Sequence, residues 1–298
     1  MPAVQILPDP RDVVPESGIR RPLAPRGCSP GTDERWDADY GSRRILGLRV
    51  DGTTYDETTA AVVDMAMSRD GGMVCVANVH MVMEAFDDPG FRALVNSADR
   101  VTPDGVPLVE ALRLLGVPNA QRVYGPTLLP IVCKRAEQLG LSVGFYGGSQ
   151  ETLDALQEKL LEDHPKLKIT YAFAPPFREL SDVEDAAVVD AIRASGAKIL
   201  FVGLGCPKQE RWMAAHRATL DIAQLGVGAA FDFIAGHKRQ APSWMQRVGL
   251  EWLFRLATEP LRLWRRYLIG NPRFLYHFAR QRRGRASRKT PFEAGRAR

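Results

Sequence analysis

The sequence predicts an α/β fold with a Rossmann-like, doubly wound and mostly parallel sheet, followed by a basic, helical C-terminal appendage. Short β-rich runs alternate with helical stretches after residue 43, which is the pattern of parallel strands joined by crossover helices. The runs LSVGFY and KILFVGLG are continuously apolar, so helices should cover both faces of the sheet. Beyond about Pro242 the β-rich runs stop and only helical stretches remain.

Residues 1–42 are predicted to form a disordered extension. They contain seven prolines and few periodic apolar positions, a composition that cannot offset the entropy of ordering the chain. The first 20 residues lack the basic stretch and apolar run of a signal peptide, and no apolar run approaches the roughly 20 residues that span a bilayer. We therefore expect a cytoplasmic protein whose membrane contact is peripheral, on the inner face of the cytoplasmic membrane.

Residues 43–241 are predicted to form the α/β domain. The expected strands occupy residues 45–50, 73–78, 141–146, 167–172, 198–205 and 223–228. The helices between them have recognisable capping residues at their starts, namely Thr53 or Thr54, Ser149, and Ser181 with Glu184. Because ligands of doubly wound sheets bind outside the carboxyl ends of the strands, the residues that follow each strand are the candidate site.

Residues 242–283 are predicted to form the helical appendage, and residues 284–298 a disordered basic tail. Pro260 and Pro272 should divide the appendage into three short helices, because proline lacks an amide hydrogen and disfavours helix just before it. Residues 261–298 hold 12 of the 40 Lys and Arg residues but only one of the 35 Asp and Glu residues, so they carry +11 and the rest carries −6.

Large apolar residues alternate with arginines in this basic stretch, as in LRLWRRYLIG. The mixture favours docking on an anionic membrane surface, where apolar groups insert and cations meet the headgroups. A nucleic-acid arm and a solvated charge run are the weaker readings, and we expect no nucleic-acid partner. The aromatic content also leaves self-association into a homo-oligomer open.

The four cysteines are scattered along the chain at positions 28, 75, 133 and 206. Their spacing fits neither a zinc site nor a dense disulfide framework. We therefore expect four free thiols and a reducing compartment.

Polar residues follow several of the expected strands. Asn78 and His80 come after the run at 73–78, and Asp104 stands in a Pro-Asp-Gly turn before a helix. Taken alone, Asp104 is more readily a helix cap, and Asn78 and His80 are turn or packing residues. Asp232, between two phenylalanines, is either a cap, a buried hydrogen-bonded carboxylate or part of a site.

Two glycine-rich loops also lie at strand ends. One contains Gly147 and Gly148, and the other runs from Gly205 to Glu210. Backbone N–H groups and the positive end of the next helix could cradle a phosphate there. Neither loop has the spacing of a dinucleotide or P-loop motif, and each also fits a tight strand-to-helix turn.

In combination these segments resemble the WecG/TagA/CpsF family, glycosyltransferase family 26. The resemblance covers roughly three quarters of the chain. It rests on the PDG turn at Asp104, G-x-G-x-P-K-Q-E from Gly203, F-D-F-x-A-G from Phe231 and R-x-x-x-E-P-x-R-x-x-R from Arg255. One such segment would carry little weight, but here all four occur together and in order.

The resemblance implies an inverting transferase that moves a sugar from a UDP-sugar to a polyprenyl-diphosphate-linked sugar in the synthesis of a cell-surface polysaccharide or glycolipid. Its basic C-terminal segment would dock on the membrane and complete the site. Asp104 would be the general base, Asn78 would lie beside the sugar, and Gln209 would belong to the donor pocket. The candidate substrate-binding residues are Gly147, Gly148, Gly205, Gln209, Asp232, Arg255, Arg262, Arg265 and Arg266.

The chain departs from the family pattern at Val76, where a threonine is frequent. The missing hydroxyl bears on which donor is used, an N-acetylmannosamine-type sugar or a plain hexose. Within the segment that carries the resemblance there is no Asp-x-Asp motif, the usual manganese-binding device of nucleotide-sugar enzymes. We therefore expect activity without metal or cofactor, with arginines and helix N-termini stabilising the leaving UDP. His80 is the second candidate base.

Two other functions fit the predicted fold less well. A nucleotide-dependent oxidoreductase would need a G-x-G-x-x-G motif after a strand and a ribose-binding acid, and neither is present. A non-catalytic membrane or nucleic-acid binding module would use the basic segment alone, and steep salt dependence of DNA binding would favour it.

Overall fold

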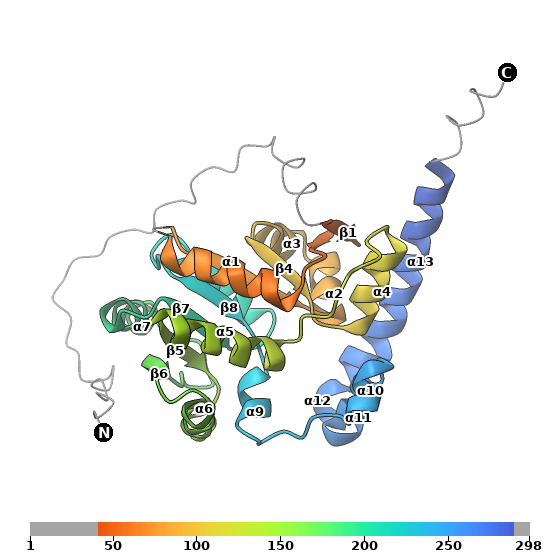
Figure 1. Ribbon diagram of the computed structural model, residues 1–298. Coiled ribbons are helices and arrows are strands. Elements are labelled where there is room, and N and C mark those ends of the chain that lie inside the picture. Colours follow the sequence, from red (N-terminus) through yellow and green to blue (C-terminus); the bar gives the residue numbers. More distant parts are fainter. Residues whose placement is uncertain (1–40, 69, 289–298) are drawn as a thin grey trace.

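The computed structural model describes residues 41–68 and 70–288 (Figure 1). Residues 1–40 and 289–298, which make up most of the two segments predicted to be disordered, lie outside the described residues. Cys28 lies there too, and the other three cysteines are free thiols. We call the described residues up to 241 the body and residues 242–288 the appendage.

A six-stranded parallel sheet forms the centre of the body, so the predicted doubly wound α/β fold is confirmed. The strand order is β4 (Arg100–Pro103), β3 (Gly72–Ala77), β8 (Ala223–Gly226), β7 (Ile199–Gly203), β5 (Ser142–Gly147) and β6 (Lys168–Phe173). Strand β4 has no counterpart among the predicted strands, because four residues ending in Pro103 are too short a pattern to stand out.

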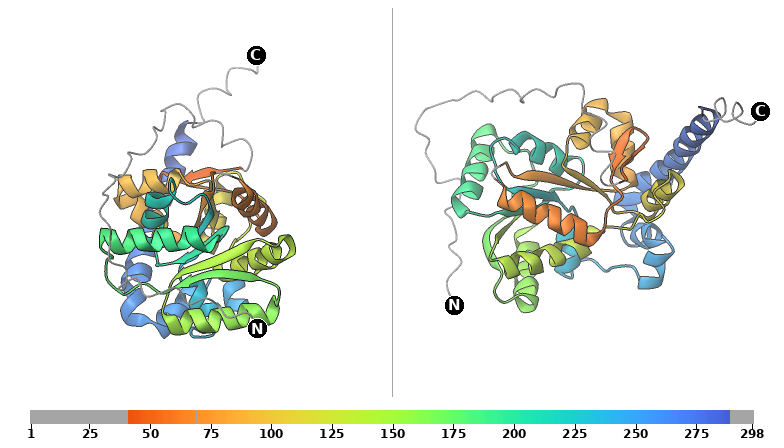
Figure 2. Two further views of the ribbon diagram at one scale, coloured as in Figure 1. Left: turned by 90° about the vertical axis from the view of Figure 1, so that its left-hand side faces the viewer. Right: turned by 45° about the horizontal axis from the view of Figure 1, so that its top comes forward.

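Helices cover both faces of the sheet (Figures 1 and 2). One face packs against α1 (Tyr55–Met67), α5 (Gly125–Leu139), α6 (Gln150–Asp163) and α9 (Ala230–Ile234). The other packs against α2 (Val79–Asp87), α3 (Pro89–Asn96), α7 (Asp182–Ser195) and α8 (Lys208–His216), while α4 (Val106–Leu114) follows β4. Thr54, Ser149 and Ser181 cap α1, α6 and α7 as predicted.

The apolar core is divided by the sheet into two clusters. In β7, Ile199 and Phe201 enter one cluster, and Leu200 and Val202 enter the other. Successive side chains of a strand point to opposite faces, so a continuous apolar run fills both clusters at once. The same reasoning, made from the sequence for LSVGFY and KILFVGLG, is therefore confirmed.

The predicted strand at 45–50 is wrong. This stretch is a hairpin of β1 (Arg43–Ile45) and β2 (Leu48–Val50) outside the main sheet. Leu46 and Gly47 have φ angles of 52° and 90°, and positive φ at both central residues is the geometry of a two-residue hairpin turn. A leucine at the first of these positions gives no turn signal, so the sequence pattern reads as one strand.

The appendage consists of α10 (Ser243–Arg247), α11 (Glu251–Thr258), α12 (Pro260–Trp264), the π-helical turn η2 (Arg265–Ile269) and α13 (Gly270–Arg288). The predicted break at Pro260 is confirmed. The predicted break at Pro272 is wrong, because α13 begins at Gly270, directly after η2, and continues through Pro272. A proline removes one helical hydrogen bond and crowds the preceding turn, and a wider π turn accommodates such a disruption. Helix α13 also continues past the predicted boundary at residue 283.

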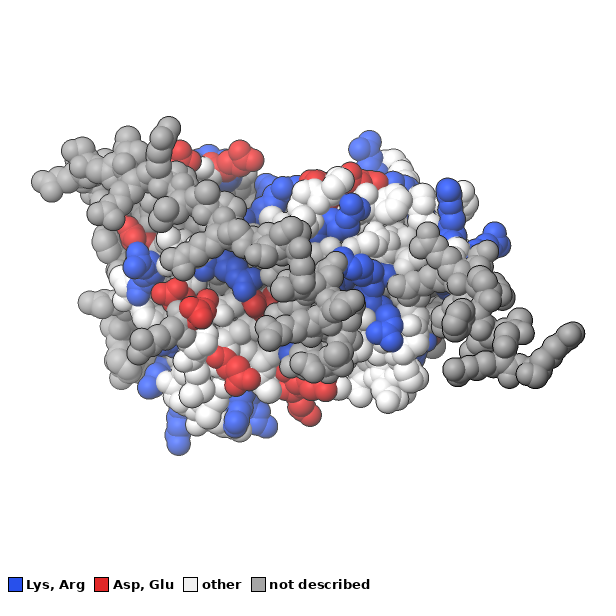
Figure 3. Space-filling view, turned by 90° about the horizontal axis from the view of Figure 1, so that it is seen from above, with Lys and Arg blue, Asp and Glu red and all other residues white. Residues whose placement is uncertain are grey.

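The two parts differ in how densely they expose large apolar side chains. The face seen from above shows basic and acidic side chains side by side where it is not drawn grey (Figure 3). Exposed large apolar side chains are more frequent along the appendage than on the body, and they include Leu261, Leu268, Leu275 and Tyr276. Within residues 41–68 and 70–288, no helix combines the length and apolar content that crossing a bilayer requires.

Candidate active site

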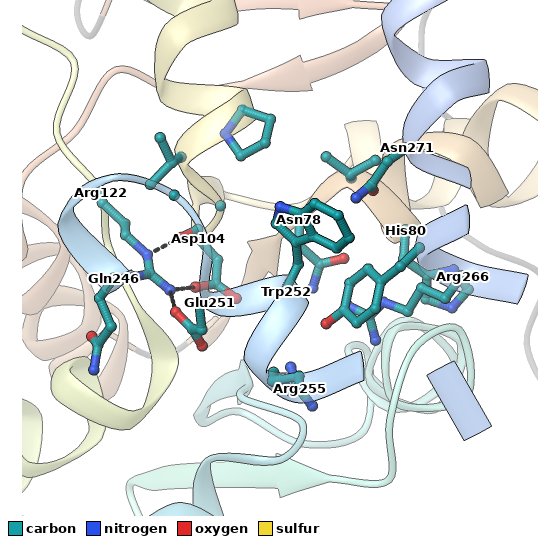
Figure 4. Close-up of a pocket in the computed structure, with 16 residues that line it drawn as sticks. Asn78, His80, Asp104, Arg122, Gln246, Glu251, Trp252, Arg255, Arg266 and Asn271 are labelled. Carbon is teal, nitrogen blue, oxygen red and sulfur yellow. Dashed lines mark hydrogen bonds and ion pairs between the residues drawn. The ribbon is translucent and has the colours of Figure 1, made fainter. Parts of the chain in front are cut away.

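Two adjoining cavities lie between the carboxyl ends of the strands and the appendage. The larger has a volume of about 470 Å³ and is lined by the loops after β7 and β8 together with arginines of the appendage. The smaller, of about 90 Å³, is lined by the start of α4 and by α11. Five residues line both: Asn78, His80, Asp104, Arg255 and Arg266. The structure thus brings the main candidates of the sequence together at one boundary (Figure 4).

Asp104 reaches this boundary because β3 and β4 run in parallel register. Ala77 pairs with Pro103, and the backbone N–H of Asp104 donates to the Ala77 carbonyl at 2.7 Å. The next residue of each strand, Asn78 and Asp104, therefore faces the same space. The N-cap of α4 is Gly105 and accepts no side-chain cap bond. Asp104 is consequently not the helix cap that its turn suggested.

The carboxylate of Asp104 is held by Arg122, in the loop before α5. The Arg122 Nε donates to the Asp104 backbone carbonyl, and its Nη2 lies 3.5 Å from Asp104 Oδ1. The pKa of Asp104 is raised from 3.8 to about 6. Burial is the main cause and the charge of Glu251 adds to it, whereas Arg122, Arg255 and Arg266 act in the opposite direction. A carboxyl with a pKa near 6 can both accept a proton near neutral pH and be ionised there.

His80 lies on the first turn of α2, with its Nδ1 3.6 Å from Glu84 Oε1. Burial lowers its pKa from 6.5 to about 4, and the charge of Arg266 adds to the effect. The imidazole is therefore neutral near pH 7 and a weaker base than Asp104. Asn78 caps α2 through its Oδ1, which accepts from the Met81 N–H at 3.3 Å. Its amide nitrogen makes no such capping bond.

Gln209 ties two glycine-rich loops together. Its Oε1 accepts from the backbone N–H groups of Gly205 and Gly228, both at 3.1 Å, and its Nε2 donates to Glu210 at 2.7 Å. Gln209 lines the larger cavity but is almost fully buried. Because its amide is engaged at both ends, it shapes the wall of the cavity. The N–H of Gly205 is likewise occupied and does not face a ligand.

Gly147, Gly148 and Asp232 line neither cavity. A Cβ on Gly147 would lie 2.6 Å from the backbone of Gly203, so this glycine permits β5 and β7 to approach closely at their ends. Asp232 forms an ion pair of 2.7 Å with Lys238, where the chain leaves the body for the appendage. These three predicted site residues therefore lie outside both cavities.

Arginines of the appendage line the larger cavity. They are Arg255, Arg262, Arg265, Arg266 and Arg273. Burial lowers the pKa of Arg266, and the nearby charge of Arg255 contributes in the same direction. The Nε of Arg255 is buried without a hydrogen-bond partner. Arg262 and Arg273 are paired with Glu259 and Asp87. Several guanidinium groups gathered in one cavity form a site suited to an anion such as a diphosphate.

Arg122, Glu251 and Trp252 were not singled out from the sequence, although all three line the smaller cavity. Glu251 Oε2 lies 2.6 Å from Arg122 Nη2 (Figure 4). The guanidinium of Arg122 also covers the ring of Tyr124, at 4.1 Å from the ring centroid. The sequence does set Glu251 apart, because it is the first acidic residue after Asp232 in a stretch otherwise rich in basic and apolar residues. For Arg122 the pairing depends on a residue 129 positions away and has no local pattern.

Helix α13 fixes the appendage to the body. Phe274 and Phe278 are buried in the cluster that includes α2, and Arg273 makes two hydrogen bonds of 2.7 and 2.9 Å to Asp87. Gln281 bonds the backbone of the β1–β2 turn region through the Leu46 N–H and the Arg44 carbonyl. The far end of the appendage is thus anchored on two elements of the body.

Comparison with known proteins places these observations in context. Residues 43–288 match the sequence profile of the family described as "Glycosyl transferase WecG/TagA/CpsF family". A relative from Bacillus spizizenii (strain W23) is 33% identical over 199 residues, which cover 66% of this chain and 75% of the relative. A relative from Staphylococcus aureus (strain NCTC 8325) is 28% identical over 242 residues, covering 80% and 92%. Both are N-acetylglucosaminyldiphosphoundecaprenol N-acetyl-beta-D-mannosaminyltransferases.

Proposed function

The chain belongs to the WecG/TagA/CpsF family of glycosyltransferases, and we propose that it transfers N-acetylmannosamine from its UDP derivative to a polyprenyl-diphosphate-linked N-acetylglucosamine. The relatives' names supply both sugars of this proposal. The oxidoreductase and binding-module alternatives are set aside by the family match.

The observation that carries the proposal is the position of Asp104 between two cavities. A transferase must hold a donor and an acceptor with the reacting atoms about 3 Å apart and a base beside them. The larger cavity, with its glycine-rich loops and arginines, suits the UDP-sugar and diphosphates. The smaller cavity, with Trp252, Asn271 and Gln246 in its wall, suits the acceptor sugar.

In the proposed reaction the acceptor hydroxyl attacks the anomeric carbon of the donor sugar from the side opposite UDP. Asp104 takes the hydroxyl proton as the new carbon–oxygen bond forms and the bond to the UDP oxygen breaks. This single displacement inverts the anomeric configuration. His80, neutral and weakly basic, is positioned to hydrogen-bond a substrate hydroxyl.

The departing UDP gains negative charge, and the arginines of the larger cavity are placed to stabilise it. Because these cations stand where a divalent metal would otherwise act, we propose metal-independent transfer. Activity that is unchanged in excess chelator agrees with this proposal, whereas activity lost in chelator and restored by Mn²⁺ contradicts it.

The appendage also presents a surface suited to an anionic bilayer. Leu261, Trp264 and Leu268 are spaced three and four residues apart, so they lie along one side of the helix, while Leu263 and Tyr267 are buried on the other. Basic residues flank the exposed row. We propose that this side inserts into the membrane interface and presents the cavities to the lipid-linked acceptor.

The test is sugar transfer from a panel of UDP-sugars to a short-chain polyprenyl-diphosphate N-acetylglucosamine in detergent, comparing the parent with Asp104→Asn. We expect UDP-N-acetylmannosamine to be used and the substitution to reduce kcat at least about a hundredfold, as for loss of a general base. Transfer of only another sugar overturns the donor assignment. An unimpaired Asp104→Asn variant overturns the base assignment, and His80→Gln is then tested.

A further inference from the structure

Glu251 is a carboxylate that the appendage inserts beside the reacting centre. It begins α11 and lines the smaller cavity, where the only other carboxylate of the lining is Asp104. Its side chain is 14% exposed and lies 2.6 Å from Arg122. Its carboxylate is engaged by the same guanidinium that contacts Asp104.

Arg122 connects the two acids. One edge of its guanidinium holds the backbone and the carboxylate of Asp104, and its Nη2 also donates to Glu251. Tyr124 covers the guanidinium from one side. Three contacts in different directions fix the plane of the guanidinium, so removal of one contact leaves it free to turn.

The backbone around Glu251 is seated closely on the body. Gly249 has a φ angle of 75°, and a Cβ there would lie 3.2 Å from a methyl group of Val106, at the start of the helix that follows Asp104. The loop therefore lies against α4, and the position of Glu251 depends on how the appendage lies on the body.

We propose that Glu251 is a positioning residue for sugar transfer, in which the appendage carboxylate holds Arg122 and Arg122 orients the Asp104 carboxylate toward the acceptor hydroxyl. This inference rests on the proposed function of Asp104 as the base. It means that the base is correctly oriented only while the appendage is seated on the body.

The charged and titratable groups that face Asp104 come from several elements: Arg122 and Tyr124 before α5, His80 on α2, Glu251 and Arg255 on α11, and Arg266 in η2. Glu251 raises the pKa of Asp104, whereas the arginines lower it. Replacing Glu251 by Gln therefore lowers the pKa of Asp104. Since the base acts when ionised, the acid limb of the rate–pH profile moves to lower pH.

The experiment measures kcat, KM and the rate–pH profile of Glu251→Gln, with Glu110→Gln as the matched control. Glu110 is an exposed carboxylate on α4 that pairs with Arg113. We expect Glu251→Gln to lower kcat by about tenfold to a hundredfold, the scale of a misplaced reacting group. KM should change little, and the acid limb should move down from about pH 6. The control should match the parent in all three.

A double-mutant cycle with Arg122→Met separates positioning from a general structural role. If Glu251 acts through Arg122, Glu251→Gln has little further effect in the Arg122→Met background. Glu251→Asp keeps the charge and should retain the parent acid limb with an intermediate kcat. If Glu251→Gln folds poorly, the kcat and the rate–pH profile of Glu251→Asp decide whether Glu251 is a positioning residue.

The two levels of proposal fail differently. A parent enzyme without transfer, or an active Asp104→Asn variant, removes the proposed function. The proposed function stands if the parent transfers sugar and Asp104→Asn does not. If, in addition, Glu251→Gln matches Glu110→Gln in kcat and in the acid limb of its rate–pH profile, the role of Glu251 is overturned. Independent, multiplicative losses in the double-mutant cycle overturn it as well.

Discussion

In the body, most large apolar side chains are enclosed between the helices and the two faces of the sheet, whereas the appendage leaves many of its own at the surface. Helix α11 has no buried residue, and Leu261 is 93% exposed. The buried members of the appendage, Leu263, Tyr267, Phe274 and Phe278, lie toward the body or toward one another. We therefore expect the body to fold on its own apolar core, and the appendage to depend on the surfaces that it touches.

This difference assigns distinct tasks to the two parts. The body fixes Asp104 and the loops at the strand ends with buried backbone and core contacts. The appendage contributes arginines and Glu251 from helices that expose more of their surface. We expect the second set to detach from the body more readily than the strands of the first set separate.

Removing the appendage beyond α11 should change activity more than any other test of this difference. A chain ending after Thr258 lacks four cavity arginines, Arg262, Arg265, Arg266 and Arg273. We expect it to keep a cooperative thermal transition and to lose at least about a thousandfold in transfer to the lipid-linked acceptor, since each charge-stabilising donor is worth about a hundredfold or more. A truncated chain that keeps its turnover would show that the body with α10 and α11 is sufficient.

Loosening the seat of α13 should have the next largest effect. Phe274→Ala removes a buried ring at the contact with α2, a change worth about 3 kcal/mol or more. We expect faster hydrogen exchange in α12 and α13 with little change in β3 and β7. Tyr276→Ala, on an exposed position of the same helix, is the matched control. Equal loosening of the central strands would mean that body and appendage unfold as one unit.

A charge on the exposed apolar side tests the membrane role separately. Leu275 and Val183 are both 62% exposed, one on α13 and the other on α7 of the body. We expect Leu275→Glu to weaken binding to anionic vesicles by about tenfold, because a buried leucine contributes about 1.5–3 kcal/mol. Val183→Glu should bind like the parent. Equal binding of both variants would place the membrane contact elsewhere.

The smallest expected effect is on stability. Asp104 has a pKa of about 6 in the folded protein against 3.8 for the ordinary side chain, so stability from this group falls as the pH rises between these values. Asp104→Asn should therefore raise the Tm by a few degrees at pH 7, and the gain should vanish below about pH 4. An unchanged Tm at pH 7 would mean that the ionised carboxylate is well compensated.

The sequence predicted most of the fold because continuous apolar runs and caps such as Thr54 and Ser181 are local signals. The prediction of elements failed where the backbone departs from the usual preference of the residue. Leu46 adopts a positive φ that is unusual for leucine, and the π-helical turn η2 lets the helix continue through Pro272. Of the site, the family resemblance led to Asp104, Asn78 and the arginines, whereas Arg122 and Glu251 pair across 129 residues and could not be found from spacing.

The bond between Arg122 and Glu251 also has a consequence for the order in which the protein is made. Domains fold from the N-terminus as the ribosome releases the chain. Strands, loops and Asp104 emerge first, while Glu251 and the arginines arrive near the end of synthesis. If Glu251 positions the base as proposed, a nascent or prematurely terminated chain has Asp104 but lacks the carboxylate that aligns it and the appendage arginines. On this proposal, such a chain would not consume activated sugar before the enzyme is complete.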